Sequence, residues 1–106
     1  MKGKDKASQP TAFLGLGMFQ PPPDPWVPVA QFWAEGDMTF DQIVVALDNG
    51  LKSVHVKIWG PKDRSPRDGR ATEVDDSGIV RVEHPVRHGI VVLLKKVNGR
   101  LLGEFT

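Results

Sequence analysis

The chain has 106 residues, enough for one domain, and its 14 Lys and Arg nearly balance 13 Asp and Glu. Because this balance gives no global field that would attract nucleic acid or an anionic membrane, neither is an expected partner. The absence of cysteine excludes disulfides, thiolate metal sites and cysteine nucleophiles. A small domain of this kind has a core that supplies only about 3–5 kcal/mol, so we expect a partner or a homo-oligomer to stabilise it.

The composition changes near residue 36. Residues 1–36 hold six of the nine prolines and five of the eight aromatic residues. Five of these prolines lie within residues 21–28, where they fix φ and favour an extended, polyproline-like chain. We therefore predict an extended, apolar and proline-rich arm over residues 1–36 and a β domain over residues 37–106. The aromatic rings of the arm would either dock on another subunit or cover an open face of the β domain.

The apolar run of residues 12–19 bears on localisation. It is too short to span a membrane and is not followed by a convincing cleavage site. We therefore expect neither a signal peptide nor a membrane span. The sequence does not fix the localisation, although it favours a cytoplasmic protein or one bound to a virion or another assembly.

Residues 39–49 fit two structures. Apolar residues recur there at helical spacing, and Thr39 with Gln42 forms a capping-box pattern. In contrast, the β-branched run 43–45 and the turn signal 48–50 favour a strand followed by a hairpin. We prefer the strand, and the alternative is an α+β fold with a helix at about residues 39–49.

The remaining segments indicate a mainly β fold. Short runs of alternating or continuous apolar residues are separated by Asp-Gly, Ser-Gly and Asn-Gly turns. Such regular spacing is typical of a small sandwich of six to seven strands or of a partly open barrel. The predicted strands after the ambiguous segment are residues 54–59, 71–74, 79–83, 90–94 and 101–105.

Three runs carry a resemblance to a known family. Residues 44–58 read VVALDNGLKSVHVKI, residues 71–82 read ATEVDDSGIVRV, and residues 88–93 read HGIVVL before Asn98-Gly99. This order of strands and turns resembles the transthyretin-like or carboxypeptidase-regulatory-like (Ig-like) sandwich modules over about residues 40–100. The resemblance implies an Ig-like or transthyretin-like sandwich that acts as a non-enzymatic spacer or interaction module. The connection at residues 85–88 is longer than is usual in the family, and a helix at residues 39–50 would argue against membership.

No pattern of catalytic or metal-binding residues stands out, so we expect no enzyme activity, cofactor or metal. His84 and His88 could share a face only on a helix, which Pro85 and Gly89 disfavour. No serine lies in a Gly-x-Ser-x-Gly sequence, and no phosphate-binding loop is present.

The residues suggest two binding surfaces. A structural accessory subunit (a decoration, cement or linker protein) would dock on a larger assembly, such as a virion or a multisubunit complex, through apolar residues of the arm. The alternative is a soluble module for carbohydrate, metal or nucleic acid, in which Trp59 stacks on the ligand beside a basic loop. The predicted partner-binding residues are Phe13, Leu14, Leu16, Phe19, Trp26 and Trp33, and the alternative ligand face consists of His55, Lys57, Trp59, Arg64 and Arg67.

Overall fold

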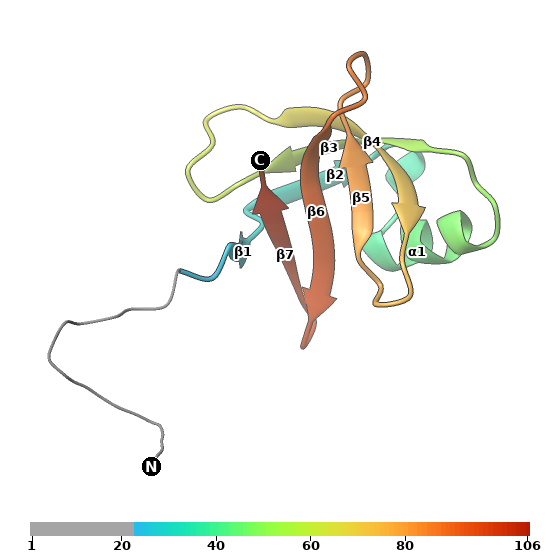
Figure 1. The fold of residues 1–106 in the computed structure, drawn as a ribbon, viewed down its shortest axis with the longest axis horizontal. Helices are drawn as coiled ribbons and strands as arrows, with labels where there is room; N and C mark the ends of the chain where they lie inside the picture. The colour runs from blue at the N-terminus through green and yellow to red at the C-terminus, as the bar shows by residue number, and fades with distance from the viewer. Residues whose placement is uncertain (1–22) are drawn as a thin grey trace, which may run out of the picture.

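A computed structural model describes residues 23–106, which form a curled antiparallel sheet with one short helix beside it (Figure 1). The prediction of a mainly β fold with six to seven strands is confirmed. The elements are β1 (Trp26–Pro28), β2 (Gln31–Ala34), the 3₁₀ turn η1 (Glu35–Asp37), α1 (Phe40–Asp48), β3 (Val54–Trp59), β4 (Arg67–Val74), β5 (Val80–Glu83), β6 (Ile90–Val97) and β7 (Arg100–Phe105).

All of the described strands belong to a single sheet, in which β3 to β7 follow one another as an antiparallel meander. The strand order is β1-β7-β6-β5-β4-β3-β2, so β1 and β2 lie at opposite ends of the order although only two residues separate them. The amide of Val29 donates to the carbonyl of Leu101 (3.0 Å), and that of Ala30 donates to the carbonyl of Trp59 (2.8 Å). Residues 26–34 therefore connect β7 to β3 and close the sheet on itself.

This closure differs from the predicted division into an arm over residues 1–36 and a domain over residues 37–106. Residues 26–34 pair with both end strands, and Ala34 is buried in the core. The physical reason is that the outermost strands of the meander leave unpaired backbone groups, which this segment satisfies. Residues 1–22, the remainder of the predicted arm, lie outside the described residues.

The core lies inside the closed sheet and is built from small aliphatic side chains. Along β3 the buried residues Val54, Val56 and Ile58 alternate with half-buried residues, as the two-residue period of a strand requires. The opposite wall comes from residues of β5 and β6, among them Val82 and Leu94, which are fully buried. The outward residues of β3 are therefore free to form a surface.

The preference for a strand at residues 39–49 is wrong, because Phe40–Asp48 is a helix. The predicted capping box forms: the amide of Gln42 donates to the Thr39 hydroxyl (3.2 Å), and the amide of Thr39 donates to Gln42 Oε1 (2.9 Å). Phe40 and Ile43 lie on one helical face and are buried. The free energy gained by their burial exceeds the cost in helix propensity of the β-branched residues. The helix is a departure from the transthyretin-like pattern.

Candidate binding surfaces

The first candidate surface is the outer side of β2 and β3. Trp33 of β2 is 42% exposed, although its large apolar ring would gain by burial. The His55 ring packs edge-on against it at a centroid distance of 5.6 Å, and Lys57 Nζ lies 5.7 Å from the ring centroid. Trp59 follows on the same side of β3 and is half-buried. We call Trp33, His55, Lys57 and Trp59 the aromatic face.

Carboxylates accompany the basic side chains on and beside the aromatic face. His55 Nε2 lies 3.2 Å from Asp68 Oδ1 on the neighbouring β4. Glu35 accepts a hydrogen bond from the amide of His55 (2.7 Å) and lies 3.6 Å from Arg70 Nη1. Glu35 thereby satisfies a backbone donor of β3 at a point that β2 does not reach.

The structure does not bring the predicted partner-binding tryptophans together. Trp26 lies on β1, which pairs with β7, and Lys95 Nζ lies 4.1 Å from the centroid of its ring, whereas Trp33 lies on β2, which pairs with β3. Trp33 belongs to the aromatic face with three residues of the predicted ligand face. The other predicted partner-binding residues lie outside the described residues, namely Phe13, Leu14, Leu16 and Phe19.

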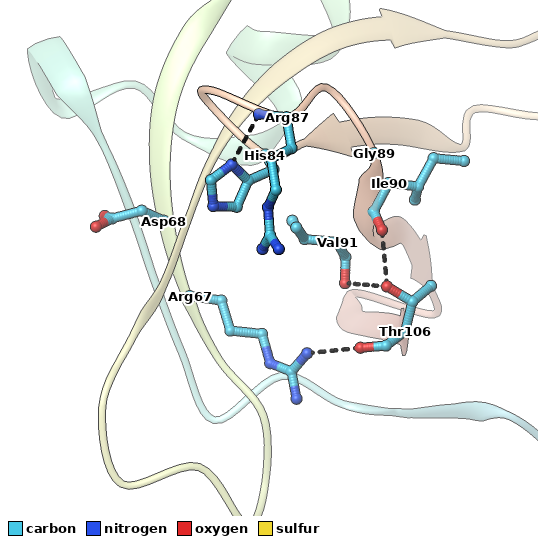
Figure 2. A pocket seen from close by; sticks show the side chains of 8 residues that line it. All are labelled: Arg67, Asp68, His84, Arg87, Gly89, Ile90, Val91 and Thr106. Carbon is cyan, nitrogen blue, oxygen red and sulfur yellow. Dashed lines mark hydrogen bonds between the residues drawn. The ribbon is translucent and has the colours of Figure 1, made fainter.

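The second candidate surface is an open cleft of about 670 Å³ beyond the end of β5. Since β5 stops at Glu83 while β4 extends back to Arg67, no strand within residues 23–106 pairs with the first residues of β4 on that side. The loop of residues 84–89 spans the gap. Figure 2 shows the lining residues: Arg67, Asp68, His84, Arg87, Gly89, Ile90, Val91 and Thr106.

Arg67 is held rigidly at one wall of the cleft. Its Nε donates to Asp63 Oδ2 (3.0 Å), its Nη1 donates to the carbonyl of Thr106 (2.9 Å), and its guanidinium carbon lies 5.0 Å from the centroid of the Phe105 ring. The hydrogen bond from Arg67, together with one from the amide of Gly60 (2.9 Å), lowers the pKa of Asp63 below its ordinary value. The carboxylate of Asp63 and the guanidinium of Arg67 therefore orient each other.

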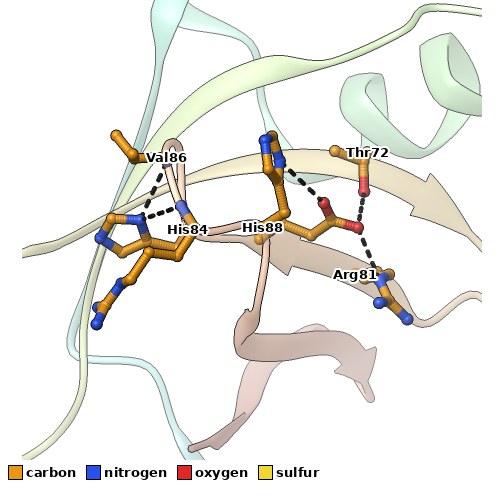
Figure 3. Close-up of polar contacts among 7 residues, drawn as sticks. Thr72, Arg81, His84, Val86 and His88 are labelled. Atoms are coloured by element: carbon orange, nitrogen blue, oxygen red, sulfur yellow. Dashed lines mark hydrogen bonds and ion pairs between the residues drawn. The ribbon is translucent and has the colours of Figure 1, made fainter.

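The opposite wall is the loop of residues 84–89, which His84 organises (Figure 3). His84 Nδ1 accepts hydrogen bonds from the amides of Val86 and Arg87, both 3.1 Å. A neutral imidazole that accepts at Nδ1 carries its proton on Nε2, so the ring retains one donor. The amide of His88 donates to the carbonyl of His84 (3.1 Å), and His88 adopts a left-handed conformation (φ 61°) at the end of this turn.

The cleft contains one predicted residue, Arg67, together with two that were not assigned to any site, His84 and Arg87. Arg64 lies in the exposed loop between β3 and β4 and does not line the cleft. The sequence feature that could have indicated Arg87 as a site residue was the unusually long connection at residues 85–88. A loop that is longer than the connection of two strands requires often carries functional residues.

Among residues 23–106, no group of three or more His, Asp or Glu side chains could hold a metal ion. His84 and His88 turn to different partners: His84 binds its own loop, whereas His88 Nδ1 lies 4.0 Å from Glu83. In the part of the chain that the structure describes, no helix has the length and hydrophobicity to cross a membrane.

No family model, curated protein or solved structure matches the chain. The resemblance to transthyretin-like or Ig-like modules therefore stays a prediction.

Proposed function

We propose that this protein is a non-enzymatic accessory subunit that docks on a larger protein assembly, such as a virion or a multisubunit complex. The observation that carries the proposal is Trp33, a large ring left 42% exposed on the outer side of the sheet. Buried aromatic residues dominate the energy of protein interfaces, and an exposed tryptophan beside half-buried neighbours is suited to that role.

The surroundings of Trp33 favour a protein partner over a nucleic acid. Binding of a polyanion depends on several unneutralised cations. Beside the aromatic face, Arg70 pairs with Glu35, and Asp68 lies 3.2 Å from the His55 ring. Acidic and basic groups interleave in this way at the polar rim of a protein interface, where they set register and specificity rather than attract a polyanion.

Residues 1–22 supply the second element of the proposal. Their sequence contains the predicted partner-binding residues Phe13, Leu14, Leu16 and Phe19, whereas the buried core of the described residues is built by residues 34–94. Prolines 21–23 then connect this sequence to β1. An apolar segment joined to a folded sheet through prolines would dock at a reduced cost in conformational entropy.

The test is co-purification with tagged full-length protein from the cells that express it, with bound proteins identified by mass spectrometry. Trp33→Ala and a deletion of residues 1–22 should each reduce the recovered partner at least tenfold. Val97→Ala is the matched control, because Val97 is also an apolar strand residue and is 41% exposed. Binding of the purified partner should then follow the same order among the variants.

Light scattering on the purified protein gives the solution mass and separates a homo-oligomer from binding to a different protein. A partner that Val97→Ala loses as readily as Trp33→Ala would contradict docking through the aromatic face. Binding of carbohydrate or nucleic acid to the wild type, lost in Trp59→Ala while the partner is retained, would favour the soluble ligand-binding module instead.

A further inference from the structure

We propose that the cleft between β4 and the loop of residues 84–89 binds a small organic phosphate. Figure 2 shows the guanidinium of Arg87 reaching into the opening beside the ring of His84, with Arg67 on the facing wall and its guanidinium turned toward Thr106. Guanidinium groups recognise phosphate oxygens through paired, charge-assisted hydrogen bonds. This site is distinct from the aromatic face and does not depend on the proposed docking.

The two arginines differ in how their donors are used. Arg67 donates a hydrogen bond from Nε to Asp63 and one from Nη1 to the carbonyl of Thr106, so its other N–H groups can bind a ligand. Within residues 23–106, no carboxylate forms an ion pair with Arg87. One cation is thus fixed in place before binding, and the other is available to close on the ligand.

Two acidic residues near the cleft, Asp68 and Glu83, are engaged elsewhere, whereas Asp63 binds Arg67 itself. Asp68 lines the cleft, but its carboxylate points away from the opening and meets His55 of the aromatic face. Glu83, which precedes the loop, accepts hydrogen bonds from Arg81 Nε (2.9 Å) and the Thr72 hydroxyl (3.4 Å). The repulsion that an anion would meet from these two carboxylates is therefore weakened.

The rest of the cleft accommodates an organic group. Ile90 and Val91 supply apolar surface beside the arginines. Their carbonyl oxygens accept hydrogen bonds from Thr106, with its hydroxyl 2.7 Å from the Ile90 oxygen and its amide 3.2 Å from that of Val91. These acceptors are therefore already satisfied, and a volume of about 670 Å³ lies within the usual range for small-molecule sites.

The test is isothermal titration of the full-length protein with phenyl phosphate, with inorganic phosphate and phenol as separate probes. Saturable binding of phenyl phosphate, tighter than that of either fragment, is expected. Because Arg87 contributes charge-assisted hydrogen bonds, Arg87→Gln should weaken binding about tenfold or more. Arg100→Gln is the matched control: Arg100 is equally an exposed arginine, but it lies at the turn between β6 and β7 and does not line the cleft.

Each other outcome overturns the proposal. Failure of the wild type to bind phenyl phosphate would exclude the site. An equal loss in Arg87→Gln and Arg100→Gln would show general attraction by the net charge instead of a cleft. Inorganic phosphate that binds as tightly as phenyl phosphate would overturn the assignment of an organic ligand. In each case the docking of Trp33 on a protein partner remains a separate question, because its test measures a different variant and a different surface.

Discussion

Residues 26–34 lie between β7 and β3, and the loop of residues 84–89 lies beyond the end of β5, beside the first residues of β4. The two places differ in how the space beside the neighbouring strands is filled. Residues 26–34 connect β7 to β3 through backbone hydrogen bonds on both sides, and the sheet is continuous there. The loop passes over the place where β5 has ended, and side chains line the gap. The closed side of this sheet therefore contributes stability, whereas the open side leaves room for a ligand.

The largest expected effect comes from removing the closing segment. Deletion of residues 1–36 eliminates β1 and β2, exposes the facing strands and removes Phe32, which packs against Phe40 at a centroid distance of 6.3 Å. We expect loss of the cooperative folded state, measured by circular dichroism and thermal unfolding. Deletion of residues 1–22 is the control, because it leaves these contacts in place. A deletion of residues 1–36 that still unfolds cooperatively would contradict the structural role of residues 26–34.

The second-largest effect compares a glycine in a closely packed strand with a glycine in the open loop. A Cβ at Gly69 of β4 would overlap Cγ1 of Val82 and lie 3.1 Å from the carbonyl oxygen of Glu83, so Gly69→Ala should destabilise the fold by about 1–3 kcal/mol. A Cβ at Gly89, in the loop, would have no atom of the described residues within 4 Å. Gly89→Ala should therefore change the midpoint of urea unfolding only slightly. Equal midpoints for the two variants would show that β4 is less closely packed than the distances indicate.

The strands of the meander could be predicted from the sequence because each depends on local signals. Alternation identified β3, and Asn98-Gly99 identified the turn before β7, where both residues have positive φ. Residues 39–49 contained signals for two structures, and their outcome depended on tertiary packing. The capping box was visible in the sequence, but the burial of Phe40 and Ile43 in the core, which favours the helix, was not.

The closing segment and the sites were harder to predict, since they depend on residues that are distant in the sequence. Prolines in residues 21–28 correctly indicated extended chain, yet the sequence could not show that residues 26–34 would pair with β3 and β7. Similarly, Arg67 and Arg87 are 20 positions apart and line the same cleft because β5 is shorter than β4. The alternation of β3 did place His55, Lys57 and Trp59 on one side, while the addition of Trp33 required the pairing of β2 with β3.

The smallest effect concerns Asp63, which links the closed sheet to the open cleft by holding Arg67. The pKa of Asp63 is lowered in the folded state. The stability that its carboxylate contributes is therefore fully present above the unfolded pKa of about 3.9, and it is lost as the pH falls through the lower pKa of the folded state. Asp63→Asn should therefore reduce the free energy of unfolding by up to about 1 kcal/mol at pH 7 and pH 5, with a smaller difference below about pH 4. Urea unfolding across this pH range measures it, and Asp76→Asn, in an exposed turn, controls for the loss of one negative charge.

The same variant also shows whether the cleft needs its fixed arginine. Without the carboxylate of Asp63, Arg67 keeps its hydrogen bond to Thr106 and its stacking on Phe105 but loses the bond that fixes Nε. If a pre-positioned Arg67 is what favours phosphate, Asp63→Asn should bind phenyl phosphate more weakly although it removes a negative charge beside the cleft. Tighter binding would show that electrostatic repulsion from Asp63 outweighs its positioning of Arg67, because removal of a nearby carboxylate alone favours an anion.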